Sequence, residues 1–163
     1  MSEYIEKLAN IIQANRFISL TPMVHLLSLP ANQLISRNTE TIIGFSETYN
    51  SGFSTSPVWD DVNKYLIVNE PGWYLILTST FWEADNKGIR SIKIYWDTDG
   101  TGFNNVIERS DKPKTRLLPF VLIMVFWYYF VPGSKVQFRV LHKSRNSLNL
   151  LAGKTQTMIY KLS

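Results

Sequence analysis

The residues that could act in catalysis are few, and most of them lie in strand-like surroundings. The chain has two histidines and no cysteine. His25 and His142 both stand in apolar stretches, where a lone histidine is more typical of a core or interface residue than of a ligand. We find no Gly-x-Ser-x-Gly elbow and no glycine loop that would cradle a phosphate. The acidic pairs Asp60-Asp61 and Glu83/Asp85 are typical of solvated turns, so the sequence predicts a protein that is not an enzyme.

One loop has the oxygen spacing of a calcium site. Residues 97–108 (DTDGTGFNNVIE) place Asp97, Asp99 and Thr101 at positions 1, 3 and 5, Gly102 at position 6 and Glu108 at position 12. This spacing is close to that of an EF-hand loop. However, a strand pattern rather than a helix precedes it, and Asp-Gly and Thr-Gly also form plain hairpin loops. Calcium binding and a simple hairpin both remain open, and no other cofactor is predicted.

Two tryptophans stand beside carboxylates, an arrangement that suits carbohydrate binding. Trp59 precedes Asp60 and Asp61, and Trp82 precedes Glu83. An exposed aromatic ring could stack on a sugar while the acids accept its hydroxyl hydrogen bonds. The alternative is that each tryptophan fills the core or an interface. A host surface glycan is therefore a candidate partner.

Composition and charge exclude several other classes of protein. The chain has 163 residues, enough for one domain, with 45% hydrophobic and 13% aromatic residues. Its net charge of +4 comes from scattered basic residues, so no nucleic-acid partner is predicted. Residues 117–131 (LLPFVLIMVFWYYFV) are too short for a spanning helix and contain Pro119, so no membrane insertion is predicted. The acidic N-terminus does not predict a signal peptide.

The elements that would position these residues are strands after one short helix. Residues 2–15 predict an amphipathic helix, with Ile5, Leu8 and Ile12 on one face. This helix could pack on its own domain, or it could be an arm that docks on a sister subunit or a larger particle. Strands are predicted at 23–29, 40–49, 64–69, 73–82, 90–96, 117–131, 135–143, 148–151 and 155–162. The pattern predicts an all-β, two-sheet jelly-roll sandwich at residues 38–163, preceded by a helix and extended attachment arm at residues 1–37.

The order of three segments resembles a known superfamily. Residues 65–76 (YLIVNEPGWYLI) resemble the strand pair around a Pro-Gly turn of the tumour-necrosis-factor-like jelly roll, the fold also used by the head domain of complement component q. Residues 130–138 (FVPGSKVQF) resemble the second glycine turn of that superfamily, and residues 157–162 (TMIYKL) its last strand. The resemblance covers residues 38–163 and implies a homotrimer around a three-fold axis lined with aromatic and aliphatic side chains.

The strand predicted at residues 117–131 supports such an assembly independently. It is apolar on both faces, whereas a small sandwich covers one face, so the other would be an exposed apolar patch of the kind that marks an interface. We expect one of two sets to pack against sister subunits. The sets are Met124, Phe126, Tyr128 and Phe130, or else Val125, Trp127 and Tyr129.

These features together predict a non-enzymatic, trimeric structural protein of a viral particle. A phage head-decoration, head-fibre or tail-fibre protein on the virion surface would attach to a capsid or tail through its N-terminal segment. A bacterial cell or spore surface is the alternative location. A receptor-binding or carbohydrate-binding module on the same scaffold is the alternative function.

Overall fold

The computed structural model describes residues 23–51, 57–85, 87–114 and 118–162, and this part of the chain is all strand and loop. Its strands are β1 (Met23–Ser28), β2 (Gln33–Ile35), β3 (Thr41–Ile42), β4 (Ser46–Ser51), β5 (Val58–Asp60), β6 (Tyr65–Val68), β7 (Gly72–Trp82), β8 (Arg90–Asp97), β9 (Asn105–Asp111), β10 (Phe120–Phe130), β11 (Ser134–His142), β12 (Leu148–Leu150) and β13 (Gln156–Lys161). The longest strands are rich in β-branched and aromatic residues, which pack well on a pleated surface.

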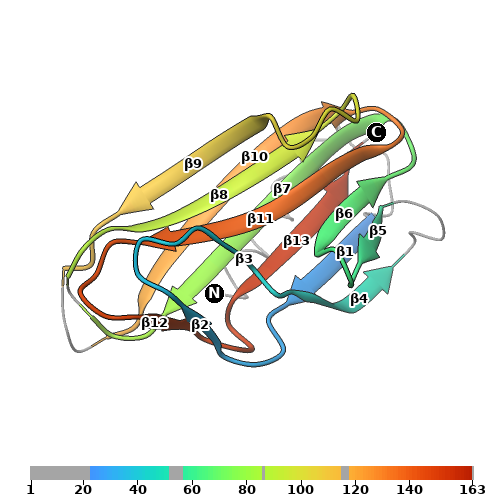
Figure 1. Ribbon diagram of the computed structural model, residues 1–163. Helices are drawn as coiled ribbons and strands as arrows, with labels where there is room; N and C mark the ends of the chain where they lie inside the picture. The colour runs from blue at the N-terminus through green and yellow to red at the C-terminus, as the bar shows by residue number, and fades with distance from the viewer. Residues whose placement is uncertain (1–22, 52–56, 86, 115–117, 163) are drawn as a thin grey trace.

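The strands form two antiparallel sheets (Figure 1). Sheet A has the order β2-β12-β7-β13-β1-β4, and β10 pairs with the other edge of β7 along its whole length. Sheet B has the order β5-β6-β11-β8-β9, and β3 also pairs with β11. Apart from β5–β6 and β8–β9, neighbours in each sheet are distant in sequence, as in a jelly roll, where the chain passes repeatedly between two sheets. The predicted all-β sandwich is confirmed.

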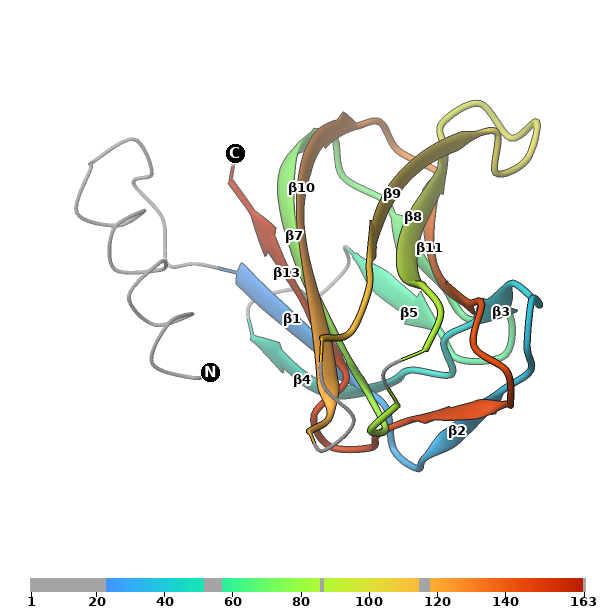
Figure 2. The same cartoon turned by 90° about the vertical axis from the view of Figure 1, so that its left-hand side faces the viewer.

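The core lies between the two sheets, which Figure 2 shows as separate layers. Sheet A contributes large side chains such as Tyr74, Trp82 and Phe130, which are fully buried. Sheet B contributes Phe138, which packs edge-on against Phe45 with ring centroids 5.7 Å apart. Alternation along strands such as β6 and β10 sends every second residue into this layer.

The apolar run predicted as a strand at residues 117–131 forms β10, which lies at the edge of sheet A. Its partner on one side is β7, in a register that joins Phe120 to Trp82 and Phe130 to Gly72.

Within the described part of the chain, no helix is long and apolar enough to cross a membrane.

The sandwich begins earlier than the boundary expected at residue 38. Strand β1 lies inside sheet A between β13 and β4, and β2 pairs with β12. Residues 23–37 therefore belong to the sandwich rather than to an arm, because they supply β1, an interior strand of sheet A, and β2, an edge strand. The predicted helix at residues 2–15 and its stripe of Ile5, Leu8 and Ile12 lie outside the described residues.

Candidate functional site

The outer face of sheet A, which points away from sheet B, carries exposed aromatic and aliphatic side chains near β10. Ile123, Val125, Trp127 and Tyr129 alternate along β10 and are 41, 43, 63 and 46% exposed. Trp73 of the neighbouring β7 is 47% exposed and packs edge-on against Tyr129, with ring centroids 5.8 Å apart. We call these five residues the β10 side of the face.

The same face continues across β7, β13 and β1 as a second apolar cluster. Leu75, Leu77 and Tyr160 form its centre, and they are only 8, 8 and 9% exposed. Val24, Met158 and Leu162 pack against that centre. We call these six residues the β13 side of the face.

The strand register makes the two sides one continuous surface. One lateral row runs through Trp127, Leu75, Tyr160 and Val24. The next row runs through Val125, Leu77, Met158 and Leu26. A contiguous apolar surface of this kind on a folded domain is typical of a contact surface for another protein element.

This geometry decides between the two sets predicted for the trimer interface. Met124, Phe126 and Phe130 are 3, 7 and 0% exposed and belong to the domain's own core, and Tyr128 packs against that core. The set named first is therefore unavailable to a sister subunit, because those side chains face sheet B. The predicted interface moves to the opposite set, Val125, Trp127 and Tyr129, together with their neighbours on the β10 side.

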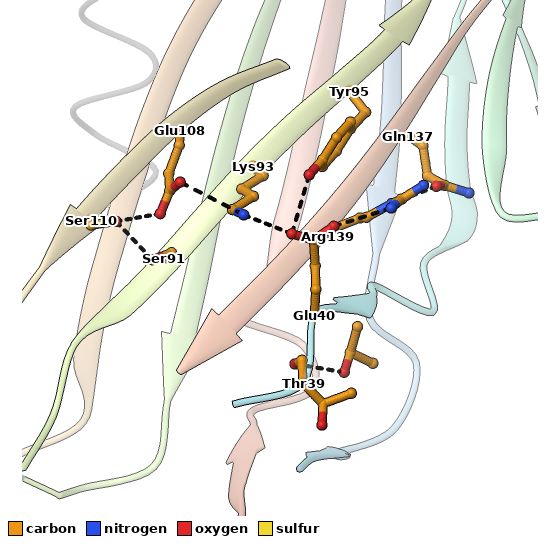
Figure 3. A network of polar contacts seen from close by, with 10 residues as sticks. Thr39, Glu40, Ser91, Lys93, Tyr95, Glu108, Ser110, Gln137 and Arg139 are labelled. Carbon is orange, nitrogen blue, oxygen red and sulfur yellow. Dashed lines mark hydrogen bonds and ion pairs between the residues drawn. The ribbon is translucent and has the colours of Figure 1, made fainter. Parts of the chain in front are cut away.

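The outer face of sheet B is different, because it carries a closed network of charged and polar groups (Figure 3). Glu40 is its centre: Lys93 Nζ donates to Glu40 Oε2 at 2.6 Å, and the Tyr95 hydroxyl donates to the same oxygen at 3.1 Å. An Arg139 guanidinium nitrogen donates to Glu40 Oε1 at 3.1 Å, and the guanidinium carbon lies 4.3 Å from the centroid of the Tyr95 ring. Lys93 also lies 3.7 Å from Glu108.

The charged groups of this network are paired with one another. Burial alone would raise the pKa of the Glu40 carboxyl, but the hydrogen bonds from Lys93, Arg139 and Tyr95 outweigh burial and hold that pKa below its ordinary value. The hydrogen bond to Glu40 raises the pKa of Lys93. Paired in this way, these residues join Glu40, just before β3, to β8 and β11, and they serve as a structural clasp rather than as acid-base groups.

In the structure, the acidic residues of the predicted calcium loop are engaged with the loop's own backbone and with β9. The Asp97 carboxylate accepts hydrogen bonds from the backbone N–H groups of Asp99, Gly100 and Gly102, at 3.2, 2.8 and 3.3 Å. Glu108 stands on β9, where it accepts a hydrogen bond from Ser110 and lies near Lys93. Among the described residues, no group of three or more histidine, cysteine or acidic side chains could hold a metal ion. The loop is a hairpin connection whose carboxylates bind its own backbone.

The two tryptophans considered for carbohydrate binding are buried. Trp82 is 0% exposed and Trp59 is 7% exposed, and both belong to the main core. The Trp59 indole N–H donates to Asp61 at 3.3 Å. Neither ring can stack on a sugar, so the prediction is wrong for these two residues.

Both histidines are fully buried, as the sequence predicted. His25 Nε2 lies 3.1 Å from Glu47, and burial lowers the pKa of His25. His142 Nε2 is 2.8 Å from the Ile35 carbonyl, and His142 Nδ1 is 2.7 Å from the Ser144 hydroxyl. This serine–histidine pair resembles part of a catalytic triad, but Ser144 is 1% exposed and cannot meet a substrate.

Comparisons with known proteins show the fold. No family model matches the sequence, and no curated protein matches it. Among solved structures, murine APRIL at pH 5.0 is similar at 14% identity and a TM-score of 0.64, covering 87% of this chain and all of that one (100%). Eiger TNF from S. frugiperda is similar at 12% identity and a TM-score of 0.58, covering 87% of this chain and 93% of that one. The fold is a TNF-like jelly roll. The superfamily resemblance predicted from the two Pro-Gly turns is thereby confirmed at the level of fold.

The β13 side of the outer face was not predicted. Leu75 and Leu77 lie in the strand predicted at residues 73–82, and Tyr160 lies in the strand predicted at residues 155–162. The signal was present in β7, where residues 73–77 (WYLIL) are apolar at every position. A run without alternation predicts a strand covered on both faces, as it did for β10.

Proposed function

We propose that this chain is a non-enzymatic TNF-like jelly-roll subunit that assembles as a homotrimer through the outer face of sheet A. The observation that supports the proposal is the β10 side of that face, with four large apolar side chains in a row on one edge strand. Interface centres favour aromatic residues and lack charged ones, and the β10 side has this composition. The superfamily resemblance implies the same stoichiometry.

The finer proposal concerns the assembly in which the trimer works. We propose a structural role on the surface of a viral particle, as a head-decoration, head-fibre or tail-fibre protein, with residues 1–22 as the attachment element. This proposal rests on the sequence: one small domain without cysteines, preceded by an amphipathic segment. Cosedimentation of the purified chain with capsids or tails that lack it tests this role. Binding to host cells instead of particles would favour receptor binding.

The oligomeric state is the direct test of the trimer. Light scattering of the full chain should give three times the subunit mass of 18.9 kDa. A chain that begins at Met23 keeps every strand of sheet A, whereas one that begins at residue 38 would lack β1 and β2. A monomer for the full chain at all concentrations would contradict the proposal, and the β10 side would then need another partner.

A further inference from the structure

Loops that are far apart in the sequence meet at one end of the sandwich, at the left of Figure 1. The strand register brings them there, because Arg90 at the start of β8 pairs with Asp111 at the end of β9 and with His142 at the end of β11. The backbone N–H of Asn38 donates to the His142 carbonyl at 3.0 Å, which adds the β2–β3 loop. This end therefore gathers the β2–β3, β7–β8, β9–β10 and β11–β12 loops.

These four loops carry more basic than acidic side chains. Their basic residues within the described part of the chain are Arg37, Lys87, Lys112, Lys114, Lys143 and Arg145. None of them forms an ion pair with another described residue, in contrast to Lys93 and Arg139 of the Glu40 network. The positive charge that is scattered in the sequence is thus concentrated at one end by the fold, where its field attracts anions.

A surface cavity of about 450 Å³ lies between the β7–β8 and β11–β12 loops. Its polar lining comes from Glu83, Asp85, Lys87, Arg145, Asn146 and Ser147. A volume of this size is within the range of small-molecule sites. The side chains of Lys87 and Arg145 form no ion pair or hydrogen bond with another described residue, so both charges are available to a ligand.

Buried polar side chains hold both loops in place around the cavity. Arg90 is 0% exposed, and its guanidinium donates to the Lys87 carbonyl at 2.6 Å and to the Asp85 carbonyl at 3.2 Å. On the other loop the Ser144 hydroxyl, 1% exposed, donates to the Asn146 carbonyl at 2.6 Å. Loops fixed in this way lose less conformational freedom when a ligand binds, which favours affinity.

We propose that this cavity binds a sugar that carries a carboxylate group. Lys87 and Arg145 would pair with the carboxylate, while the Glu83 carboxylate would accept hydrogen bonds from the sugar hydroxyls. A nucleic acid fits these loops poorly, because Glu83 and Asp85 would repel its phosphates and the loops contain no aromatic residue to stack on a base. The site does not require the trimer, since its lining residues lie outside both sides of the outer face of sheet A.

Binding of the full-length chain to an array of oligosaccharides tests this proposal. The array would contain sialylated, uronic-acid, sulfated and neutral members, with single-stranded DNA as a further probe. We expect carboxylate-bearing members to bind at least about tenfold more tightly than their desialylated or methyl-esterified counterparts, because these lose a charge-assisted hydrogen bond. Binding to carboxylate-bearing members that is absent, or no stronger than binding to sulfated members or DNA, would overturn the proposal.

Variants distinguish a built site from general attraction between charges. Lys87→Gln combined with Arg145→Gln should weaken binding of the best carboxylate-bearing sugar by at least about tenfold. The matched control, Lys135→Gln with Lys154→Gln, removes the same charge outside these four loops and should leave the affinity unchanged. An equal loss of affinity in the control would overturn the proposal.

The substitution Glu83→Gln gives opposite results for the two kinds of binding. General attraction to a basic surface becomes stronger when an acidic group is removed, whereas a sugar site loses a charged acceptor and should bind about fivefold more weakly. An unchanged or higher affinity of Glu83→Gln would overturn the proposal. The native mass is measured on the same samples, and a monomeric chain that still binds the sugar would contradict the trimer alone.

Discussion

Replacement of Trp127 by serine should weaken trimer formation much more than it disturbs the folded subunit. The Trp127 side chain is 63% exposed in the single subunit. An aromatic side chain buries up to about 250 Å², so about 150 Å² of this indole remains available to a partner. At about 25 cal/mol per Å², its complete burial at a subunit contact would contribute up to about 4 kcal/mol per subunit.

Only part of this area needs to be buried for a measurable effect. If half is buried, the loss of about 2 kcal/mol corresponds to about a 30-fold weaker contact at each subunit. Sedimentation velocity over a range of concentrations would measure the shift of the trimer–monomer midpoint. Val62→Ser is the matched control, because Val62 is 90% exposed and lies in the turn between β5 and β6, away from this face.

A Trp127→Ser chain with the same trimer–monomer midpoint as the parent would show that Trp127 is not at the subunit contact. The same holds if Val62→Ser shifted the midpoint equally, since the effect would then not depend on the face. Circular dichroism of both variants should match that of the parent, because neither side chain belongs to the core.

Three further predictions concern the sandwich itself. Gly88 has a φ of +71°, and an added Cβ would lie 2.1 Å from the Lys143 carbonyl oxygen, so Gly88→Ala should lower the free energy of unfolding by about 2–4 kcal/mol in urea titrations. The hydroxyls of Thr78 and Thr157 are buried 2.8 Å apart, so Thr157→Val should cost about 1–3 kcal/mol, and adding Thr78→Val should recover much of that loss. Because the pKa of the Glu40 carboxyl is lowered on folding, its contribution to stability is present above the ordinary value of 4.5 and is lost as the pH falls through the folded value. The unfolding free energy of Glu40→Gln, measured by denaturation between about pH 6 and pH 3, should therefore depend less on pH than that of the parent.

The strands that bury one face were predictable, because burial leaves a pattern in the sequence. In β8, Ile92 and Ile94 alternate with polar residues, and both are 0% exposed. In β11, Val136, Phe138 and Val140 alternate in the same way and are equally well buried. Period-two alternation of this kind identifies a strand without any knowledge of its partners.

Strand β9 was not predicted, and the reason is physical. All seven of its residues are exposed, since it lies at the edge of sheet B and pairs only with β8. Val106 and Ile107 are consecutive and both are exposed, so no alternation marks the strand. Its existence is fixed by the ladder with β8, in which Asn105 opposes Trp96 and Asp111 opposes Arg90. A strand that is held by its pairing, with no buried face of its own, leaves no alternation in its sequence.

The candidate site was predictable in part. The sequence shows that β10 is apolar on both faces, but it does not show which face meets the core, because a shift of one residue exchanges the two sets. The pairing of β10 with β7 settles this, since Phe126 opposes Ile76, another core residue, whereas Trp127 opposes Leu75. The burial of Trp59 was equally hidden, because its neighbours Asp60 and Asp61 are typical of an exposed turn.

The contrast between the two outer faces indicates which one can serve as the subunit contact. On sheet B the Glu40 network already pairs its charges, so covering it with protein would remove water from ionic groups without offering them new partners. On sheet A the β10 side presents Trp127 and Tyr129, whose burial removes apolar surface from water. A protein contact on the outer face of sheet A is therefore favourable in free energy, whereas a contact on the outer face of sheet B is unfavourable. A trimer that used sheet B would have to supply charged partners to groups that are already paired with one another. We therefore expect the outer face of sheet A to be the subunit contact.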